Sequence, residues 1–214
     1  MTPPRILRGS IRVEHWIDGY RRFRVTGWPE QRRLFESLAA AGQSPKVLVI
    51  ACIDSRLDPA VIFNVRPGEM LTVRNVANLV PPYAPDAAYH GTSAALEFGI
   101  RVLEIPQIIV LGHSLCGGVR ALLDGAPVNA RDFVAPWMSI AGPARVAALA
   151  CDSADERQRC CEQEVVKLSL ANLMTFPWIA EPVAAGRLAL NGAWFAIHSG
   201  VLATLQPDGS FAAQ

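Results

Sequence analysis

The sequence predicts a single-domain α/β fold: a mostly parallel central sheet flanked by helices, with an N-terminal helical arm and a C-terminal edge hairpin. Two observations favour this class. Short apolar runs typical of strands alternate with helical patterns, and polar residues of reactive types stand directly after two of those runs. The 214 residues, of which 51% are hydrophobic, also suffice to bury a sizeable core.

The N-terminal arm, residues 1–40, precedes a domain that we expect to span residues 41–214. Apolar side chains recur in the arm among charged ones, a pattern typical of an amphipathic segment that needs a surface to cover. They are Ile11, Val13, Trp16, Ile17, Tyr20, Phe23 and Val25.

The elements of the domain follow in a regular order. Helices are expected near residues 30–41, 92–103 and 117–124, and strands near 46–52, 70–75 and 106–111. A longer amphipathic helix is expected over 157–174, and the sequence at 176–178 ends it. Two apolar runs, 188–197 and 201–206, joined by a turn at 198–200, predict the edge hairpin.

The first expected strand is followed by a thiol, a carboxylate and a guanidinium. Residues 46–52 are apolar and rich in β-branched side chains, which predicts a strand buried on both faces. If the chain stays extended, Cys52, Asp54 and Arg56 alternate onto one side, while Ile53 points to the other and affects packing only. Active sites of such sheets lie beyond the carboxyl ends of the strands, where these residues fall.

The third expected strand breaks at Gly112 and is followed by His113 and Cys116. A helix then begins at Gly117 and Gly118, glycines that let backbone N–H groups approach a ligand.

Together the two strand ends favour a zinc site. Two thiolates and an imidazole suit a zinc ion held tetrahedrally, and three protein ligands leave the fourth position for water. Taken singly, Cys52 and Cys116 could be core residues and His113 a structural histidine. Taken jointly, with a carboxylate and an arginine beside them, they favour a catalytic metal site.

These residues resemble the motif of the β-class carbonic anhydrases, a C-x-D-x-R strand end followed later in the chain by H-x-x-C-G-G. The resemblance continues through residues 42–46, 67–69, 74–78, 91–98 and 172–178. It therefore covers most of the chain.

The resemblance implies reversible hydration of carbon dioxide to bicarbonate and a proton, with one Zn²⁺ per chain held by Cys52, His113 and Cys116. Asp54 would either orient the reacting water or become a metal ligand itself, and Arg56 decides between these roles by pairing with it. A surface ion pair is the ordinary alternative for such residues. Because two thiolates cancel the charge of the ion, we expect activity to rise towards alkaline pH.

The resemblance is to the open-site, type I-like form of the family. The form regulated by bicarbonate carries a tryptophan and a tyrosine beside the arginine that Arg74 matches, and this chain has Val49 and Phe98 there. Open-form relatives have phenylalanine at position 71 and tyrosine at position 98, so this chain departs from them twice. The substrate-binding residues implied are Gln43, Leu71, Val76, Phe98 and Gly117.

The resemblance and the composition together indicate which partners to expect. The resemblance implies a homo-oligomer with a dimer as the minimum unit, wrapped by the arm. The net charge of +1 argues against a nucleic-acid surface, and no apolar stretch is long enough to span a membrane. The start of the chain lacks a signal-peptide core, so we expect a cytoplasmic protein in which Cys151, Cys160 and Cys161 are free thiols.

Two rival functions stay open. The same centre could hydrolyse carbonyl sulfide or carbon disulfide. The second rival function is a non-catalytic bicarbonate-sensing protein. In such a protein we would expect a damaged Asp-Arg pair, but both Asp54 and Arg56 are present.

Overall fold

The structure, a computed structural model, describes residues 13–86 and 88–214 and divides into two compact units, residues 1–43 and 44–214. In the first unit, α1 (Val13–Val25) and α2 (Gly27–Ala41) form the expected helical arm. Trp28 packs against Phe23 and Phe35 inside this unit. Trp16 and Tyr20 of α1 are exposed, as an amphipathic arm predicts, whereas Ile11 lies outside the described residues.

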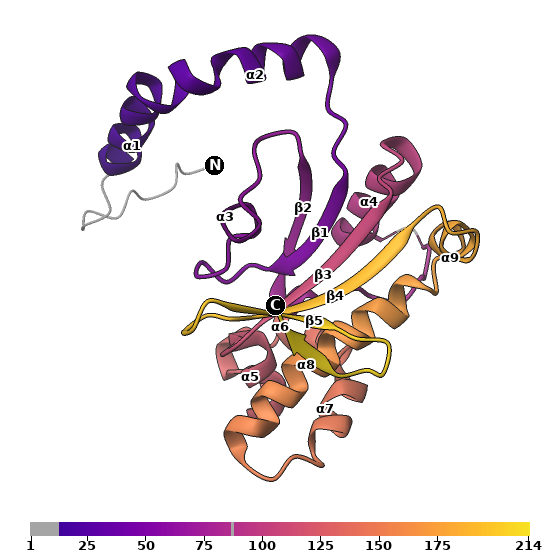
Figure 1. The fold of residues 1–214 in the computed structure, drawn as a ribbon. Helices are drawn as coiled ribbons and strands as arrows, with labels where there is room; N and C mark the ends of the chain where they lie inside the picture. The colour runs from indigo at the N-terminus through magenta and orange to yellow at the C-terminus, as the bar shows by residue number, and fades with distance from the viewer. Residues whose placement is uncertain (1–12, 87) are drawn as a thin grey trace, which may run out of the picture. The chain divides into compact units, whose positions relative to one another are not determined.

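The second unit is built on a six-stranded sheet in the order β2-β1-β3-β4-β5-β6 (Figure 1). The strands are β1 (Val47–Cys52), β2 (Met70–Asn75), β3 (Gln107–His113), β4 (Ala189–Ala196), β5 (Val201–Leu205) and β6 (Phe211–Ala213). The first four pair in parallel, while β5 and β6 are antiparallel additions. This confirms the predicted mostly parallel sheet.

The central strands are buried on both faces, as their continuous apolar sequences predict. In β1, Val49 and Ala51 belong to one core cluster, and Leu48 and Ile50 belong to the other. The first cluster is covered by α5 (Gly117–Asp124), α6 (Val134–Ser139) and α7 (Gly142–Ala148). The second is covered by α4 (Gly91–Glu97) and α9 (Pro177–Ala184).

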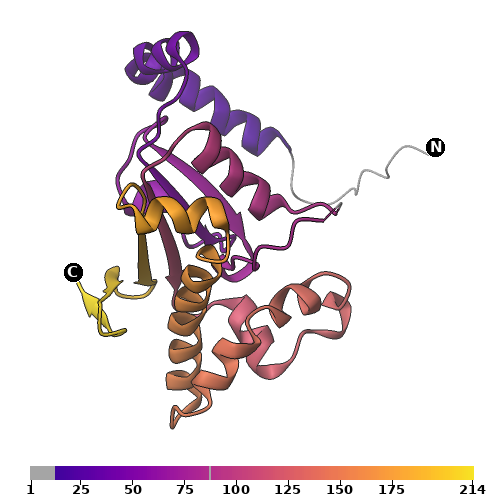
Figure 2. The same ribbon diagram turned by 90° about the vertical axis from the view of Figure 1, so that its right-hand side faces the viewer.

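The long helix α8 (Ala154–Leu173) contributes side chains to both clusters and lies beside α7 (Figures 1 and 2). It begins at a capping box in which the Ser153 hydroxyl accepts from the Glu156 N–H and the Glu156 carboxylate accepts from the Ser153 N–H. Gly112 does not end β3 as expected. The strand continues through it to His113. Glycine is required at this position because a Cβ there would lie 2.7 Å from Val166 of α8.

Several elements differ from the sequence-based expectation. The helix expected over 92–103 is α4 followed by a π-helical turn, Phe98–Val102. Residues 176–178 do not end the helical region: Pro177 occupies the first turn of α9, where its missing N–H costs nothing. Short helical segments that the pattern does not reveal are α3 (Pro59–Ile62), α6, α7, and the 3₁₀ turns Val76–Asn78 and Val128–Ala130.

The C-terminal hairpin is present but is not itself the sheet edge. Its first strand, β4, pairs in parallel with β3, and its second strand pairs with β6, which forms the outer edge.

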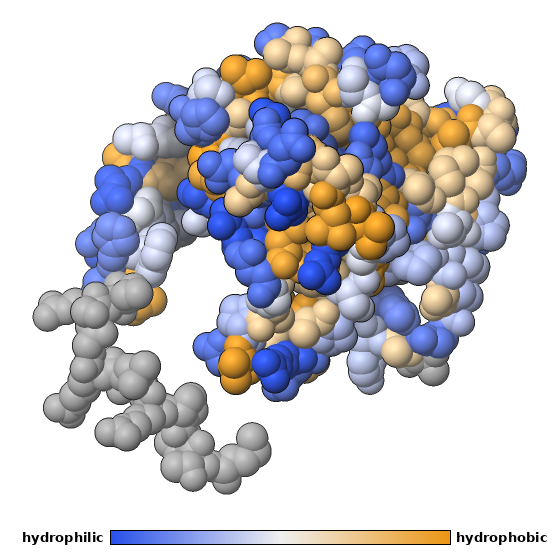
Figure 3. All heavy atoms as spheres, turned by 90° about the horizontal axis from the view of Figure 1, so that it is seen from below, coloured by the Kyte–Doolittle hydropathy of each residue, from blue (hydrophilic) through white to orange (hydrophobic). Residues whose placement is uncertain are grey.

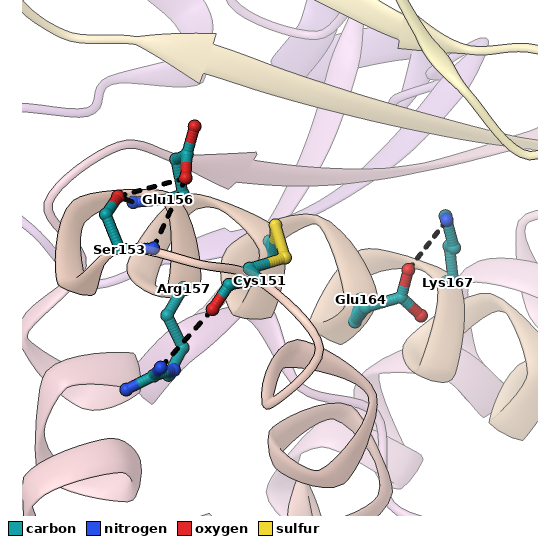
Figure 4. Close-up of a disulfide and its surroundings, with 7 residues drawn as sticks. Cys151, Ser153, Glu156, Arg157, Glu164 and Lys167 are labelled. Atoms are coloured by element: carbon teal, nitrogen blue, oxygen red, sulfur yellow. Dashed lines mark hydrogen bonds and ion pairs between the residues drawn. A yellow bond between two sulfur atoms is a disulfide. The ribbon is translucent and has the colours of Figure 1, made fainter.

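The expectation of three free cysteines near α8 is wrong for two of them. Cys151 and Cys160 form a disulfide (Figure 4), and Cys161 is free and buried. The two paired residues are nine positions apart, and the turn between α7 and α8 brings them together.

None of the helices within residues 13–86 and 88–214 combines the length and the apolar character that a membrane crossing requires.

Candidate metal centre

The loop after β1 holds an Asp-Arg pair through turn geometry. The strand ends at Cys52, and the Arg56 N–H donates to Asp54 Oδ1 at 3.0 Å. Arg56 Nε donates to the same oxygen at 3.0 Å, and Arg56 Nη2 donates to Asp54 Oδ2 at 2.8 Å. The pair is therefore bidentate, but a turn rather than continued strand alternation creates it. Ile53 is 56% exposed, and the expectation that it affects packing only stays a prediction.

Arg74 fixes this loop from the neighbouring strand β2. Its Nε donates to the Cys52 carbonyl at 3.0 Å, and its Nη2 donates to the carbonyls of Asp54 and Leu57 at 2.7 and 2.6 Å. A guanidinium occupied by three backbone oxygens acts here as a support of the Cys52 loop.

The second strand end brings His113 and Cys116 to the same edge of the sheet. Because β1 and β3 are parallel neighbours, their carboxyl ends meet there. His113 Nδ1 lies 2.9 Å from the Ser114 carbonyl, which can only accept, so the ring donates from Nδ1 and Nε2 is left as the ligating atom. Leu115 has a φ of 58°, and this left-handed turn leads to Cys116 at the start of α5.

Cys52, His113 and Cys116 offer three ligand atoms that all lie within 4.8 Å of one another, and all three residues are buried. The two Sγ atoms are 3.9 Å apart. Two thiolates bound at about 2.3 Å to a tetrahedral zinc ion would be about 3.8 Å apart, so this separation fits the ion. His113 Nε2 is buried and has no hydrogen-bond partner among the described residues, which is the condition of a ligand atom.

The ionisable groups of this cluster shift one another's pKa values. The contact with Cys116 lowers the pKa of the Cys52 thiol, and the same contact raises the pKa of Cys116. Burial by itself lowers the pKa of His113, but the neighbouring Cys52 sulfur and its charge outweigh burial, so the pKa rises. Cys52 is therefore the sulfur that ionises first, next to Cys116 and His113.

Asp54 is paired with Arg56, which favours its ionised form. The Arg56 side chain holds the pKa of the Asp54 carboxyl well below its ordinary value. Arg56 donates to both carboxylate oxygens of Asp54. The group of candidate ligands consists of Cys52, His113 and Cys116. The role of Asp54 as a metal ligand therefore stays a prediction.

Helix α8 supports Cys116 with residues that sequence reasoning missed. Glu162 Oε1 accepts from the Cys116 N–H at 3.0 Å and from Gln158 Nε2 at 2.8 Å, and Glu162 Oε2 accepts from Trp194 Nε1 at 3.2 Å. Gln158 Nε2 also donates to the Cys116 carbonyl at 3.1 Å. The sequence does contain one signal for them: Gln158 and Glu162 are four residues apart, so they share one face of α8, and the rest of that face is buried.

The expected substrate-binding residues lie in different environments. Val76 packs on the core cluster that contains Cys52 and Cys116, and a Cβ on Gly118 would lie 2.7 Å from its side chain. Gly117 opens α5, and a Cβ there would meet no atom within 4 Å. Leu71 packs on the other core cluster, and Phe98 is 47% exposed. Gln43 ends the N-terminal unit, so its role stays a prediction, as do those of the other four.

Comparisons with known proteins agree on one family. A family model described as carbonic anhydrase matches residues 47–202. "Beta carbonic anhydrase 3" of Arabidopsis thaliana is 38% identical over 190 residues, which cover 86% of this chain and 72% of that protein.

Solved structures give the same result. The structure of the β-carbonic anhydrase CcaA has a TM-score of 0.88 and 32% identity, and the match covers 94% of this chain and 99% of that one. A tetrameric β-carbonic anhydrase of the filamentous ascomycete Sordaria macrospora has a TM-score of 0.79 and 26% identity, with 94% and 98% covered. A Coccomyxa β-carbonic anhydrase in complex with acetazolamide has a TM-score of 0.79 and 26% identity, with 92% and 87% covered.

Proposed function

Because this chain belongs to the carbonic anhydrase family, whose members are lyases, we propose that it catalyses the reversible hydration of carbon dioxide to bicarbonate and a proton. One observation carries the proposal. The ligand atoms of Cys52, His113 and Cys116 converge within 4.8 Å at the carboxyl edge of a parallel sheet.

We propose one Zn²⁺ per chain, held by these three residues. Zinc, when bound, supplies the Lewis acidity that lowers the pKa of water towards neutrality. Arg74 stabilises the loop of the first thiolate, and Glu162 stabilises the segment of the second through the Cys116 N–H. Supports of this kind keep the ligands in place and tune their basicity.

Asp54 is the proposed hydrogen-bond acceptor that orients the reacting water. Its low pKa keeps the carboxylate ionised at neutral pH, so it accepts a hydrogen bond and does not donate one. Arg56 is a positioning residue: its two parallel donors fix the orientation of the carboxylate. Arg56 Nη2 also donates to the Leu115 carbonyl at 3.1 Å, which ties the pair to the loop of Cys116.

The open-site form of the reaction is part of the proposal. The guanidinium of Arg74 already donates to three carbonyls, which argues against a second bicarbonate at that position. Gln43, Leu71, Val76, Phe98 and Gly117 remain the proposed substrate contacts.

We further propose a homo-oligomer with a dimer as the minimum unit. The described part of α1 exposes Trp16, Tyr20 and Val25, side chains that normally require a covering surface. A relative of similar fold is tetrameric. Light scattering coupled to size exclusion tests this, and a stable monomer at micromolar concentration would refute it.

A cytoplasmic location also remains a proposal. Disulfides are rare in reducing compartments, so cytoplasmic protein should have Cys151 and Cys160 reduced. Rapid alkylation of cell extracts followed by mass spectrometry tests this, and a fully oxidised pair would contradict the location.

The activity is tested by stopped-flow hydration of carbon dioxide with the zinc content measured on the same sample. We expect turnover in the wild type and its collapse in Asp54→Asn, which keeps the shape of the side chain but removes its charge. A zinc-loaded wild type that hydrates no carbon dioxide would refute the proposal. Turnover of carbonyl sulfide or carbon disulfide by that sample would then identify the substrate class.

A further inference from the structure

A pocket of about 280 Å³ lies apart from the metal ligands, between α5, α7 and the start of α8. We propose that it binds a small oxyanion that carries a proton, the chemistry shared by bicarbonate and hydrogen phosphate. The residues that line it are Arg120, Leu123, Asp124, Arg145, Leu149, Ala154, Arg157 and Gln158.

The lining is positively charged. Three arginines converge there against one carboxylate, so its formal charge is 3 − 1 = +2, in a chain whose total is +1. The single carboxylate, Asp124, is 4.0 Å from Arg120, and both side chains are more than half exposed. Arg145 has no acidic partner within 4.0 Å among the described residues. Guanidinium groups in this arrangement favour an oxyanion because each can donate two hydrogen bonds in parallel.

Arg157 adds a donor without a partner. Its Nη2 donates to the Cys151 carbonyl at 3.3 Å (Figure 4), whereas its Nε is buried and unpaired among the described residues. A buried N–H of a charged group is costly to leave unsatisfied, so an acceptor is expected beside it. An oxyanion in the pocket would supply that acceptor.

Gln158 adds an acceptor, which distinguishes the kind of anion. The residue is 4% exposed, and its Nε2 donates to the Cys116 carbonyl and to Glu162 Oε1. The Cys116 carbonyl can only accept, so the orientation of the amide is fixed. Its Oε1 is buried and has no donor among the residues that the structure describes. An O–H group on the bound anion would satisfy it, which bicarbonate and hydrogen phosphate offer and nitrate and sulfate do not.

The pocket is separate from the metal centre but adjoins it through one side chain, since Gln158 contacts the backbone of Cys116. It also differs from the position of Arg74, which is occupied by carbonyls. The end of the domain formed by α5, α7 and the start of α8 faces the viewer in Figure 3, where strongly hydrophilic side chains lie among hydrophobic ones. Arg120 and Arg145 are exposed, so an anion can exchange with solvent.

The test is isothermal titration calorimetry of the full, zinc-loaded protein at about pH 8 and low ionic strength, where surface charges are least screened. Two matched pairs of probes isolate the proton: hydrogen phosphate against sulfate, and bicarbonate against nitrate. Arg120→Gln/Arg145→Gln removes two donors from exposed positions. Arg159→Gln, on α8 but outside the pocket lining, is the control for lost charge.

We expect hydrogen phosphate and bicarbonate to bind about fivefold or more tightly than their matched ions, because only they complete the bond to Gln158 Oε1. The double substitution should weaken both by about tenfold or more, and Arg159→Gln should change neither by more than about twofold. Comparing the two affinities identifies which anion the pocket prefers. Binding at the pocket is the binding that the double substitution weakens, since the metal centre is unchanged in that variant. Equal pocket affinity for protonated and unprotonated ions, or a double variant that binds every probe as the wild type does, would overturn the inference.

Discussion

Glu162 gives the sharpest test of how the fold supports the metal ligands. The side chain is 2% exposed, and its two oxygens accept from Cys116 N, Gln158 Nε2 and Trp194 Nε1. Glu162→Leu fills a similar volume but offers no acceptor. Gln158 keeps its bond to the Cys116 carbonyl, so two donors are orphaned. At about 1–3 kcal/mol for each, we expect the free energy of unfolding to fall by about 2–6 kcal/mol.

Glu162→Gln is the matched variant, because it keeps one acceptor oxygen for Cys116 and Gln158 and leaves only the Trp194 N–H unsatisfied. We expect a smaller loss, about 1–3 kcal/mol. Urea denaturation at one fixed protein concentration measures both values, since an oligomer's stability depends on concentration. Zinc affinity should fall in the same order, by about 10–100-fold for the leucine variant.

The pH dependence of these variants checks the same reasoning. Burial raises the pKa of Glu162 above its ordinary value of 4.5. A raised carboxyl pKa in the folded state stabilises the protein below the unfolded pKa, and this contribution is lost as pH rises through the folded pKa. The wild type should therefore lose stability relative to Glu162→Gln as pH rises above about 4.5. Equal stability of wild type and Glu162→Leu, or no pH-dependent difference, would refute this account of α8.

Three further outcomes follow from the site and the disulfide. Arg56→Ala frees the Asp54 carboxylate, and because a misplaced group can cost about 100-fold in turnover, we expect a loss of that order in stopped-flow hydration. An unchanged rate would mean that Asp54 and Arg56 form only a surface ion pair. Hydration should rise from about pH 6.5 to about pH 9, since two thiolates weaken the acidifying effect of the ion; a flat profile would count against a two-thiolate site. Cys151→Ser/Cys160→Ser should lose about 2–3 kcal/mol of unfolding free energy in urea, and adding reductant to the wild type should reproduce that loss.

Much of the fold and the ligand set could be predicted because they depend on local pattern. Apolar runs with reactive residues at their ends indicate parallel strands, and parallel neighbours bring Cys52 and His113 to one edge whatever the rest of the chain does. The Asp54–Arg56 pair was also predicted, although a turn and not an extended strand forms it.

The remaining features depend on long-range packing. The sequence pattern makes Gly112 a strand breaker, yet it lies inside β3, where α8 approaches too closely for any residue with a Cβ. The sequence alone indicates a solvated Glu162 in a charged helix, but Cys116 and Trp194 from other elements, and Gln158 one turn earlier on α8, donate to it. The pairing of Cys151 with Cys160 depends on the turn between two helices, which no local pattern fixes.

The most direct test of the central claim removes the metal with a chelator and restores zinc in known amounts while carbon dioxide hydration is followed. The account predicts no turnover without zinc and a rate that rises linearly to one zinc per chain. It also predicts that Cys116→Ser shifts this titration to higher zinc concentrations. Full turnover by metal-free protein, or none after one zinc per chain has bound, would contradict it.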